Sequence, residues 1–318
     1  MQIGQFTLRV GVLDQAQLTF ATWGQLNADG DNAVLLPSYF TGTHTHYAPL
    51  IGRNRALDPE RYFIVAPNIF GNGVSTSPSH GVAWAPVTIE DNIHAQHQLL
   101  RNLGVEHLRL AGGWSMGAMQ ALHFAMLYPS MVTSVVAICG TGFCWPINTA
   151  FLRGIMPILE STGTAGEQLA LDLFGRAYCG WAYSAAFFRD GLHRNLGYAS
   201  IQALLDNWAQ EHQRHRALDL LAVLHAWANT ARSPASARAA LSQITACCFI
   251  VPCDTDCYFT VEDAIFEASA IRHAVLQPLT SPYGHCAGAP GRFSAESTYI
   301  ETIFSRALSQ TVSKPCLI

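Results

Sequence analysis

Leu108-Arg109-Leu110-Ala111-Gly112-Gly113-Trp114-Ser115-Met116-Gly117 contains the clearest structural signal in the chain. Its apolar first half predicts a buried strand, and the following residues 118–128 predict a helix that ends before Pro129. A G-x-S-x-G pattern between a strand and a helix is typical of a nucleophile elbow, a sharp turn that exposes a serine hydroxyl. Bulky side chains would not fit beside such a turn, which explains glycine at 113 and 117. The pattern therefore predicts Ser115 as a catalytic nucleophile.

Similar apolar, β-branched runs recur along the chain and predict the other strands of a sheet. They lie at 5–10, 17–22, 33–37, 62–67, 132–139, 246–252 and 274–278. The later runs are continuous rather than alternating, which is typical of parallel strands that are covered on both faces. Helical patterns at 88–103 and 118–128 alternate with these strands. Together they predict an α/β fold with a mostly parallel central sheet flanked by helices.

The alternation of strands and helices stops in the middle of the chain. Residues 146–240 contain no strand-like run, but they place leucines and tryptophans at helical spacing. We expect a helical lid insertion over this range. The α/β core is then built from 1–145 and 241–318.

Composition excludes several classes of function. Half of the 318 residues are hydrophobic, only 13% are charged, and the formal net charge is −4. The basic residues are scattered arginines with a single lysine, Lys314, so we expect no nucleic-acid partner. Uninterrupted apolar runs of about 20 residues are absent, so we expect no membrane span. The first residues lack the pattern of a signal peptide, which favours a cytoplasmic location.

A serine hydroxyl needs a base to remove its proton and an acid to orient that base. After an elbow of this kind the expected chain order is Ser, Asp or Glu, then His. His285 follows the predicted strand at 274–278 and is the expected base. Asp254 and Asp256 both follow the strand at 246–252. We favour Asp256 because it lies further out on the loop, and Asp254 stays an alternative.

Backbone N–H groups near the serine predict an oxyanion hole. The expected donors are Phe40, in the loop after the third strand, and Met116, which follows the nucleophile. Their neighbours Tyr39 and Trp114 are expected to contact substrate. We expect no metal site, because the histidines have no convincing set of ligand partners. Instead, we expect His212 and His215 to belong to a solvated face of the insertion.

Together these stretches resemble the homoserine O-acetyltransferase family of α/β-hydrolase-fold enzymes, from about residue 33 to 304. The segments that carry the resemblance are Phe40-Thr41-Gly42, Thr88-Ile89-Glu90-Asp91-Asn92, Trp114-Ser115-Met116-Gly117-Ala118-Met119-Gln120, Thr255-Asp256 and Tyr283-Gly284-His285. The resemblance implies a triad of Ser115, Asp256 and His285. It also implies substrate-binding roles for Arg176 and Tyr183, which match an Arg and a Tyr seven residues apart in the family's insertion. In the family this Arg binds the acceptor's carboxylate, and the chains form dimers through the lid helices.

One departure from the family affects the predicted reaction. Homoserine acetyltransferases have an Asp directly after the catalytic His, where it pairs with the acceptor's ammonium, whereas this chain has Cys286. We therefore predict hydrolysis of a small ester or thioester through an acyl-enzyme, without a cofactor. The alternative is an O-acyltransferase that uses acyl-CoA as co-substrate and an acceptor other than homoserine. A second alternative, from another class, is a lyase or binding scaffold without an acyl-enzyme.

Overall fold

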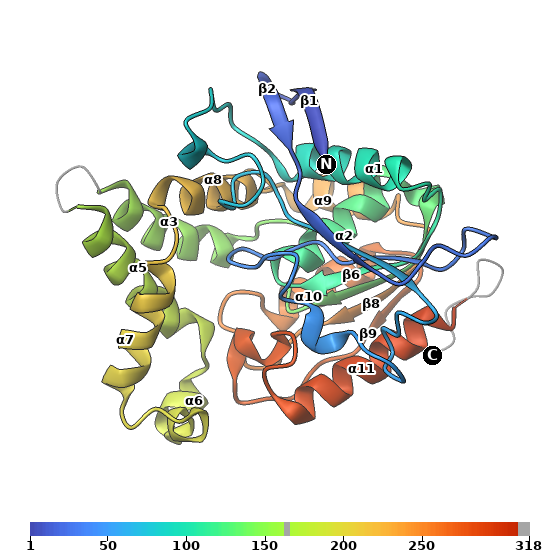
Figure 1. Cartoon of the computed structure of the whole chain (residues 1–318). Coiled ribbons are helices and arrows are strands. Elements are labelled where there is room, and N and C mark those ends of the chain that lie inside the picture. Colours follow the sequence, from blue (N-terminus) through green and yellow to red (C-terminus); the bar gives the residue numbers. More distant parts are fainter. Residues whose placement is uncertain (162–165, 311–318) are drawn as a thin grey trace.

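A computed structural model describes residues 1–161 and 166–310. Over these ranges the chain forms a seven-stranded sheet in the order β3-β5-β4-β6-β7-β8-β9, beside a separate two-stranded hairpin of β1 and β2 (Figure 1). The seven strands are β3 (Phe20–Trp23), β4 (Ala33–Leu35), β5 (Phe63–Pro67), β6 (Leu108–Trp114), β7 (Val132–Ile138), β8 (Cys247–Val251) and β9 (Ala274–Leu276). Only β3 pairs antiparallel to its neighbour, and the other pairs are parallel. The predicted α/β class and mostly parallel sheet are confirmed.

The first two predicted strands were placed wrongly. The hairpin consists of β1 (Gln2–Thr7) and β2 (Val12–Gln17), and β3 begins only at Phe20. The predicted strand at 5–10 ends early because the chain reverses after Thr7. This turn is closed by a hydrogen bond from Leu8 N–H to the carbonyl of Gly11, whose φ of 93° suits glycine.

Helices cover both faces of the sheet. On one face lie α1 (Ile89–Asn102), α2 (Met116–Leu127) and α10 (Val261–Ala270), and on the other lies α11 (Ser294–Leu308). Two neighbouring residues of β6 reach different cores: Leu110 packs on the α11 side, and Ala111 on the α2 side. Burial on both faces explains why this strand is apolar apart from Arg109, which is only partly buried.

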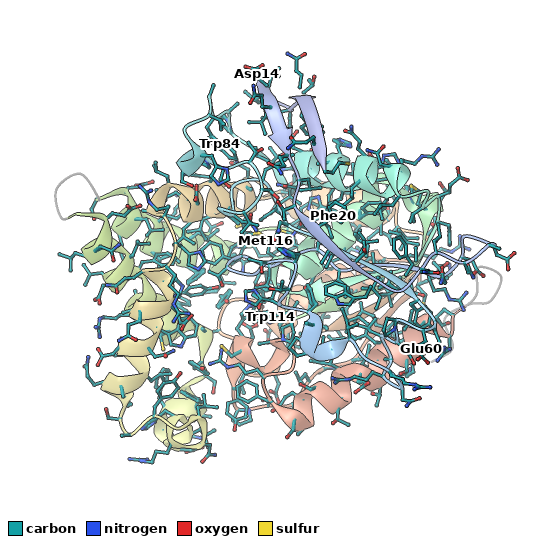
Figure 2. All side chains as sticks on the ribbon, in the orientation of Figure 1. Asp14, Phe20, Glu60, Trp84, Trp114 and Met116 are labelled. Carbon is teal, nitrogen blue, oxygen red and sulfur yellow. The ribbon has the colours of Figure 1, made fainter. Side chains whose placement is uncertain are left out.

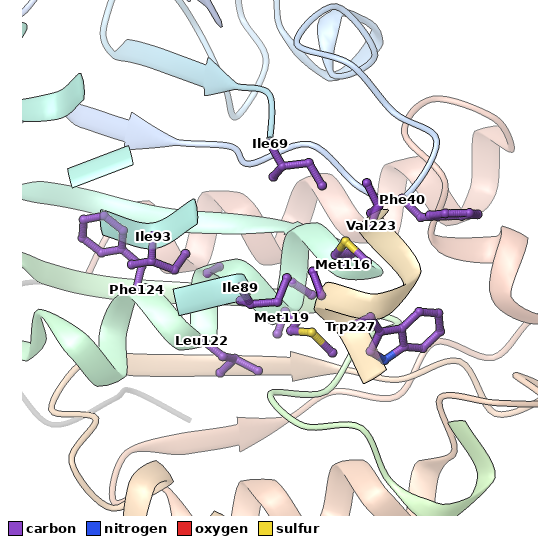
Figure 3. Close-up of a cluster of buried hydrophobic side chains, with 14 of the residues drawn as sticks. Phe40, Ile69, Ile89, Ile93, Met116, Met119, Leu122, Phe124, Val223 and Trp227 are labelled. Atoms are coloured by element: carbon purple, nitrogen blue, oxygen red, sulfur yellow. The ribbon is translucent and has the colours of Figure 1, made fainter. Parts of the chain in front are cut away.

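The segment between β7 and β8 is helical. It consists of α3 (Pro146–Glu160), α5 (Glu167–Ala182), α6 (Ala185–Arg189), α7 (Ile201–His212), α8 (Ala217–Ala228) and α9 (Pro234–Leu241). Helices α3, α5, α6 and α7 extend to one side of the sheet (Figure 1). Figure 3 shows Val223 and Trp227 of α8 near Met116 and Met119 of α2, within one hydrophobic cluster. The lid therefore shares its core with one face of the sheet.

Among the helices of residues 1–161 and 166–310, none is both long enough and apolar enough to cross a membrane.

Candidate active site

Ser115 lies in a strained turn between β6 and α2. Its φ of 58° and ψ of −125° are rarely adopted by residues other than glycine. The turn is held from both sides, because Ser115 N–H donates to the carbonyl of Ile138 at 2.8 Å and its own carbonyl accepts from Met119 N–H at 3.1 Å. Neighbours that fix the backbone in this way keep the serine side chain at the carboxyl edge of the sheet.

The glycines of the elbow are required by close packing. A Cβ on Gly113 would lie 2.7 Å from the hydroxyl oxygen of Tyr47, and one on Gly117 would lie 2.6 Å from that oxygen and from the carbonyl oxygen of Pro37. The Tyr47 hydroxyl donates to Pro37 at 3.0 Å and accepts from Trp114 N–H at 3.1 Å. Through these two hydrogen bonds the phenol of Tyr47 stabilises the turn.

The three side chains predicted as a triad lie in one hydrogen-bonded chain. His285 Nε2 is 2.9 Å from Ser115 Oγ, and His285 Nδ1 is 2.7 Å from Asp256 Oδ2. The imidazole is 2% exposed and the Asp256 carboxylate is fully buried. This geometry allows the imidazole to accept the serine proton while the carboxylate holds its other nitrogen.

The structure separates the two candidate acids. Asp256 Oδ1 accepts from the backbone N–H groups of Tyr258 and Phe259, at 3.1 and 3.0 Å, which leaves Oδ2 for the imidazole. Asp254 is exposed and accepts from Ser281 N–H at 3.1 Å. Asp254 therefore stabilises a turn, and Asp256 faces His285.

Aromatic rings surround the imidazole of His285. Ring centroids of Tyr258, Trp114 and Phe259 lie 4.5, 5.0 and 5.4 Å away. Trp114 also donates its indole N–H to the carbonyl of His285 at 3.1 Å. Figure 2 labels Trp114 and Met116, the two neighbours of the nucleophile, near the middle of the molecule. These contacts fix the orientation of the base.

A pocket of about 630 Å³ opens over the nucleophile. Its walls come from the loop after β4, the elbow, the end of α7 and the segment after His285. Tyr39, Phe40 and Trp114 line it, in agreement with their predicted location. Neither Phe40 N–H nor Met116 N–H donates to an acceptor within the described ranges. Both donors are therefore available to an oxyanion.

Comparisons with known proteins agree with this geometry. Residues 34–157 match the alpha/beta hydrolase fold family. Over 99% of its length the chain is 30% identical to an ethyl acetate hydrolase of Pseudomonas veronii, covering 95% of that protein. The chain belongs to the α/β-hydrolase family. It superimposes on the solved acetyl esterase MekB with a TM-score of 0.93, at 29% identity over 98% of this chain and 96% of that one. It is also 28% identical to a homoserine O-acetyltransferase of Trichormus variabilis, over 86% of this chain and 84% of that protein.

This α/β-hydrolase is therefore an enzyme of the hydrolase or acyltransferase type, as predicted. Its similarity to homoserine O-acetyltransferases does not extend to the substrate-binding pair implied by the resemblance. Arg176 is outside the described lining of the pocket, and it pairs with Asp172 at 2.7 Å and Asp206 at 2.8 Å. Tyr183 is fully buried behind the pocket wall. The two side chains do not share one helix face, because α5 ends at Ala182 and Tyr183 has an extended backbone.

Two pocket residues were missed or misplaced by the sequence analysis. Arg292 lines the pocket and donates to the Tyr183 hydroxyl at 2.6 Å. Its sequence signal was weak, namely an arginine seven positions after His285. His212 was expected on a solvated face, but it is buried in the pocket wall, where its Nδ1 contacts the carbonyl of Trp208 at 2.7 Å. Burial lowers the pKa of His212 to about 4, so it stays neutral.

Cys286, the residue directly after the base His285, is buried. Cys286 lines the pocket and is 2% exposed. Burial raises the pKa of the Cys286 thiol to about 11, although nearby Arg292 opposes the shift. At neutral pH the thiol is uncharged and cannot pair with a substrate ammonium. In the described ranges, no group of three or more His, Cys, Asp and Glu side chains is arranged to hold a metal ion.

Proposed function

We propose that this enzyme hydrolyses small acetyl esters through an acetyl-enzyme on Ser115. The observation that carries the proposal is the continuous hydrogen-bonded chain from Ser115 through His285 to Asp256 at the base of the pocket. Acetyl is favoured as the acyl group because the relatives named above act on ethyl acetate or are acetyl esterases.

In the proposed reaction, His285 takes the proton of Ser115 as Oγ attacks the ester carbonyl. The N–H groups of Phe40 and Met116 stabilise the oxyanion, and Asp256 stabilises the imidazolium. His285 then protonates the leaving alcohol. Water, activated by the same imidazole, releases acetate and restores the serine.

Hydrolysis is favoured over transfer to an amino-acid acceptor by the neutral thiol of Cys286. An ammonium buried beside this thiol without a counter-charge would cost several kcal/mol of binding free energy. The proposed reaction needs no cofactor, and its partner is a small acyl substrate. Acyl-CoA would enter only as the donor of the alternative reaction, transfer to another hydroxyl compound, which the homoserine O-acetyltransferase relative supports.

The test compares wild type with Ser115→Ala on ethyl acetate, p-nitrophenyl acetate and acetyl-CoA, the last with and without L-homoserine. We expect acetate release from the esters, its loss in the variant, and no stimulation of thiol release by homoserine. Homoserine-dependent thiol release that Ser115→Ala abolishes would establish a transferase. Ester turnover that survives in a folded Ser115→Ala protein would contradict covalent catalysis and favour the scaffold alternative.

Two further properties stay proposals. A homodimer through the lid is supported by Leu169 and Leu173, which are 50% and 46% exposed on one face of α5. Light scattering of the purified protein tests it. The cytoplasmic location is tested by cell fractionation.

A further inference from the structure

Arg292 contributes a positive charge to the wall of the pocket. Histidines aside, the charged side chains among its described lining residues are Glu211, Arg214 and Arg292. Glu211 and Arg214 form an ion pair with each other at 3.1 Å. For Arg292, no carboxylate of residues 1–161 or 166–310 lies within ion-pair distance. Arginine keeps its charge at all ordinary pH values, so this pocket wall is cationic.

The groups that contact Arg292 hold it without neutralising it. Its Nη2 donates to the hydroxyl of Tyr183 at 2.6 Å, and its guanidinium lies over the Tyr183 and Phe293 rings at 5.7 and 5.8 Å. Burial raises the pKa of both Tyr183 and Cys286, so neither supplies a negative charge at neutral pH. Because Tyr183 is fully buried and stacked on Phe187 at 4.0 Å, it is a rigid support for the guanidinium.

A guanidinium carries five N–H donors in a planar fork, and Tyr183 occupies one of them. The remaining donors suit a carboxylate, which an arginine binds through two parallel hydrogen bonds. Arg292 is an exposed residue of the pocket lining, so a ligand can reach it.

We propose that Arg292 binds a carboxylate on the alcohol part of the ester, so that the preferred substrates are O-acetylated hydroxy acids. This inference rests on the proposed acetyl-ester hydrolysis. An acetyl group is too small to carry the carboxylate itself, and the pocket of about 630 Å³ has room for a larger alcohol part. Amino-acid alcohols are disfavoured because Glu211 is paired and Cys286 is neutral.

The proposed turnover is balanced. The bond between the acetyl carbonyl carbon and the ester oxygen breaks, and the acetyl group bonds to Ser115 Oγ. The hydroxy acid leaves with the proton that His285 took from the serine. Water then divides between the products: its hydroxyl bonds to the acetyl carbon to give acetic acid, and its remaining proton returns through His285 to Ser115. The acetic acid loses its proton to solvent and leaves as acetate.

The experiment measures kcat and KM for acetate release from matched pairs of esters that differ only in charge. Acetoxyacetate is compared with acetoxyacetamide, and 4-acetoxybutanoate with 4-acetoxybutanamide. Monomethyl succinate, with methanol release as the readout, tests a carboxylate on the acyl part. We expect wild type to prefer the acid of at least one acetoxy pair, mainly through a lower KM.

In Arg292→Met the preference for acid over amide, taken as the ratio of kcat/KM values, should fall about 10- to 100-fold, the effect of one charged hydrogen-bonded contact. Arg292→Lys should keep part of the preference. Arg176→Met is the matched control, because this arginine lies outside the described lining of the pocket and already has carboxylate partners, and the variant should keep all of the preference.

Several outcomes would overturn the inference. A wild type that hydrolyses the amides as well as the acids refutes the carboxylate site but leaves ester hydrolysis intact. A preference that survives in Arg292→Met, or that disappears equally in Arg176→Met, assigns the carboxylate to another group. Faster turnover of monomethyl succinate than of the acetoxy acids moves the carboxylate to the acyl part and refutes the substrate class. If none of the esters is hydrolysed, the proposed function itself fails.

Discussion

Asp256→Asn isolates the contribution of the triad acid, because the substitution keeps the size of the side chain and changes one atom. In the wild-type protein Oδ1 accepts from two backbone N–H groups and Oδ2 faces His285 Nδ1 at 2.7 Å. The asparagine must place its carbonyl oxygen where Oδ1 was, since an NH₂ group there would face two donors. Its NH₂ group therefore points at the imidazole and donates to Nδ1.

This donation fixes the wrong tautomer of His285. With Nδ1 as an acceptor, the ring proton lies on Nε2, which faces Ser115 Oγ at 2.9 Å and can no longer accept the serine proton. Locking the imidazole in this way lowers kcat by about 10⁴-fold, or roughly 5 kcal/mol of barrier. Asp254→Asn is the matched control. Its new carbonyl oxygen can still accept from Ser281 N–H, so we expect less than a tenfold change.

The assay is initial-rate hydrolysis of p-nitrophenyl acetate by wild type and both variants at neutral pH. Thermal unfolding monitored by circular dichroism checks that each variant is folded. The reasoning is refuted if folded Asp256→Asn retains more than about a tenth of the wild-type kcat, because a wrong tautomer costs far more. A greater loss in Asp254→Asn than in Asp256→Asn would move the triad acid to Asp254.

Two predictions concern stability. Gly117→Ala places a Cβ 2.6 Å from the Pro37 carbonyl oxygen and should lower the free energy of unfolding in urea by about 1–3 kcal/mol. Gly154→Ala, in an exposed turn of α3 with no atom within 4 Å, should raise it by about 0.5–1 kcal/mol, and equal effects would contradict the steric argument. Burial lowers the pKa of His123 from 6.5 to about 4, so the unfolded chain binds the extra proton first and stability falls as pH drops through this window. His123→Gln can still donate to the Gly142 carbonyl. In this variant the unfolding free energy lost between pH 6.5 and pH 4 should be smaller by up to about 3 kcal/mol. A loss as large as in wild type would show that His123 is not responsible.

Most of the catalytic chain was predictable because its signals are local. The elbow is marked by glycines at 113 and 117, on either side of Ser115, where a Cβ would collide with neighbouring atoms. The mostly apolar residues of β6 indicate burial on both faces. Chain order then placed Asp256 and His285 after the last strands, since parallel strands bring their carboxyl ends to one edge of the sheet. The N-terminal strands were less predictable, because one glycine turn determined where the hairpin reversed.

The sequence by itself determined the fold class, the nucleophile and its base, because each is specified by residues that are neighbours in the chain or by strand order. Only the tertiary structure decided between the two acids and between the arginines. The pairing of Arg176 with Asp172 follows ordinary helical spacing, but the sequence could not reveal that Asp206 also holds Arg176, or that Arg292, more than a hundred residues later, reaches the pocket. The physical reason is that a charge acts on whatever the fold places beside it, and partners such as Asp206 are distant in sequence.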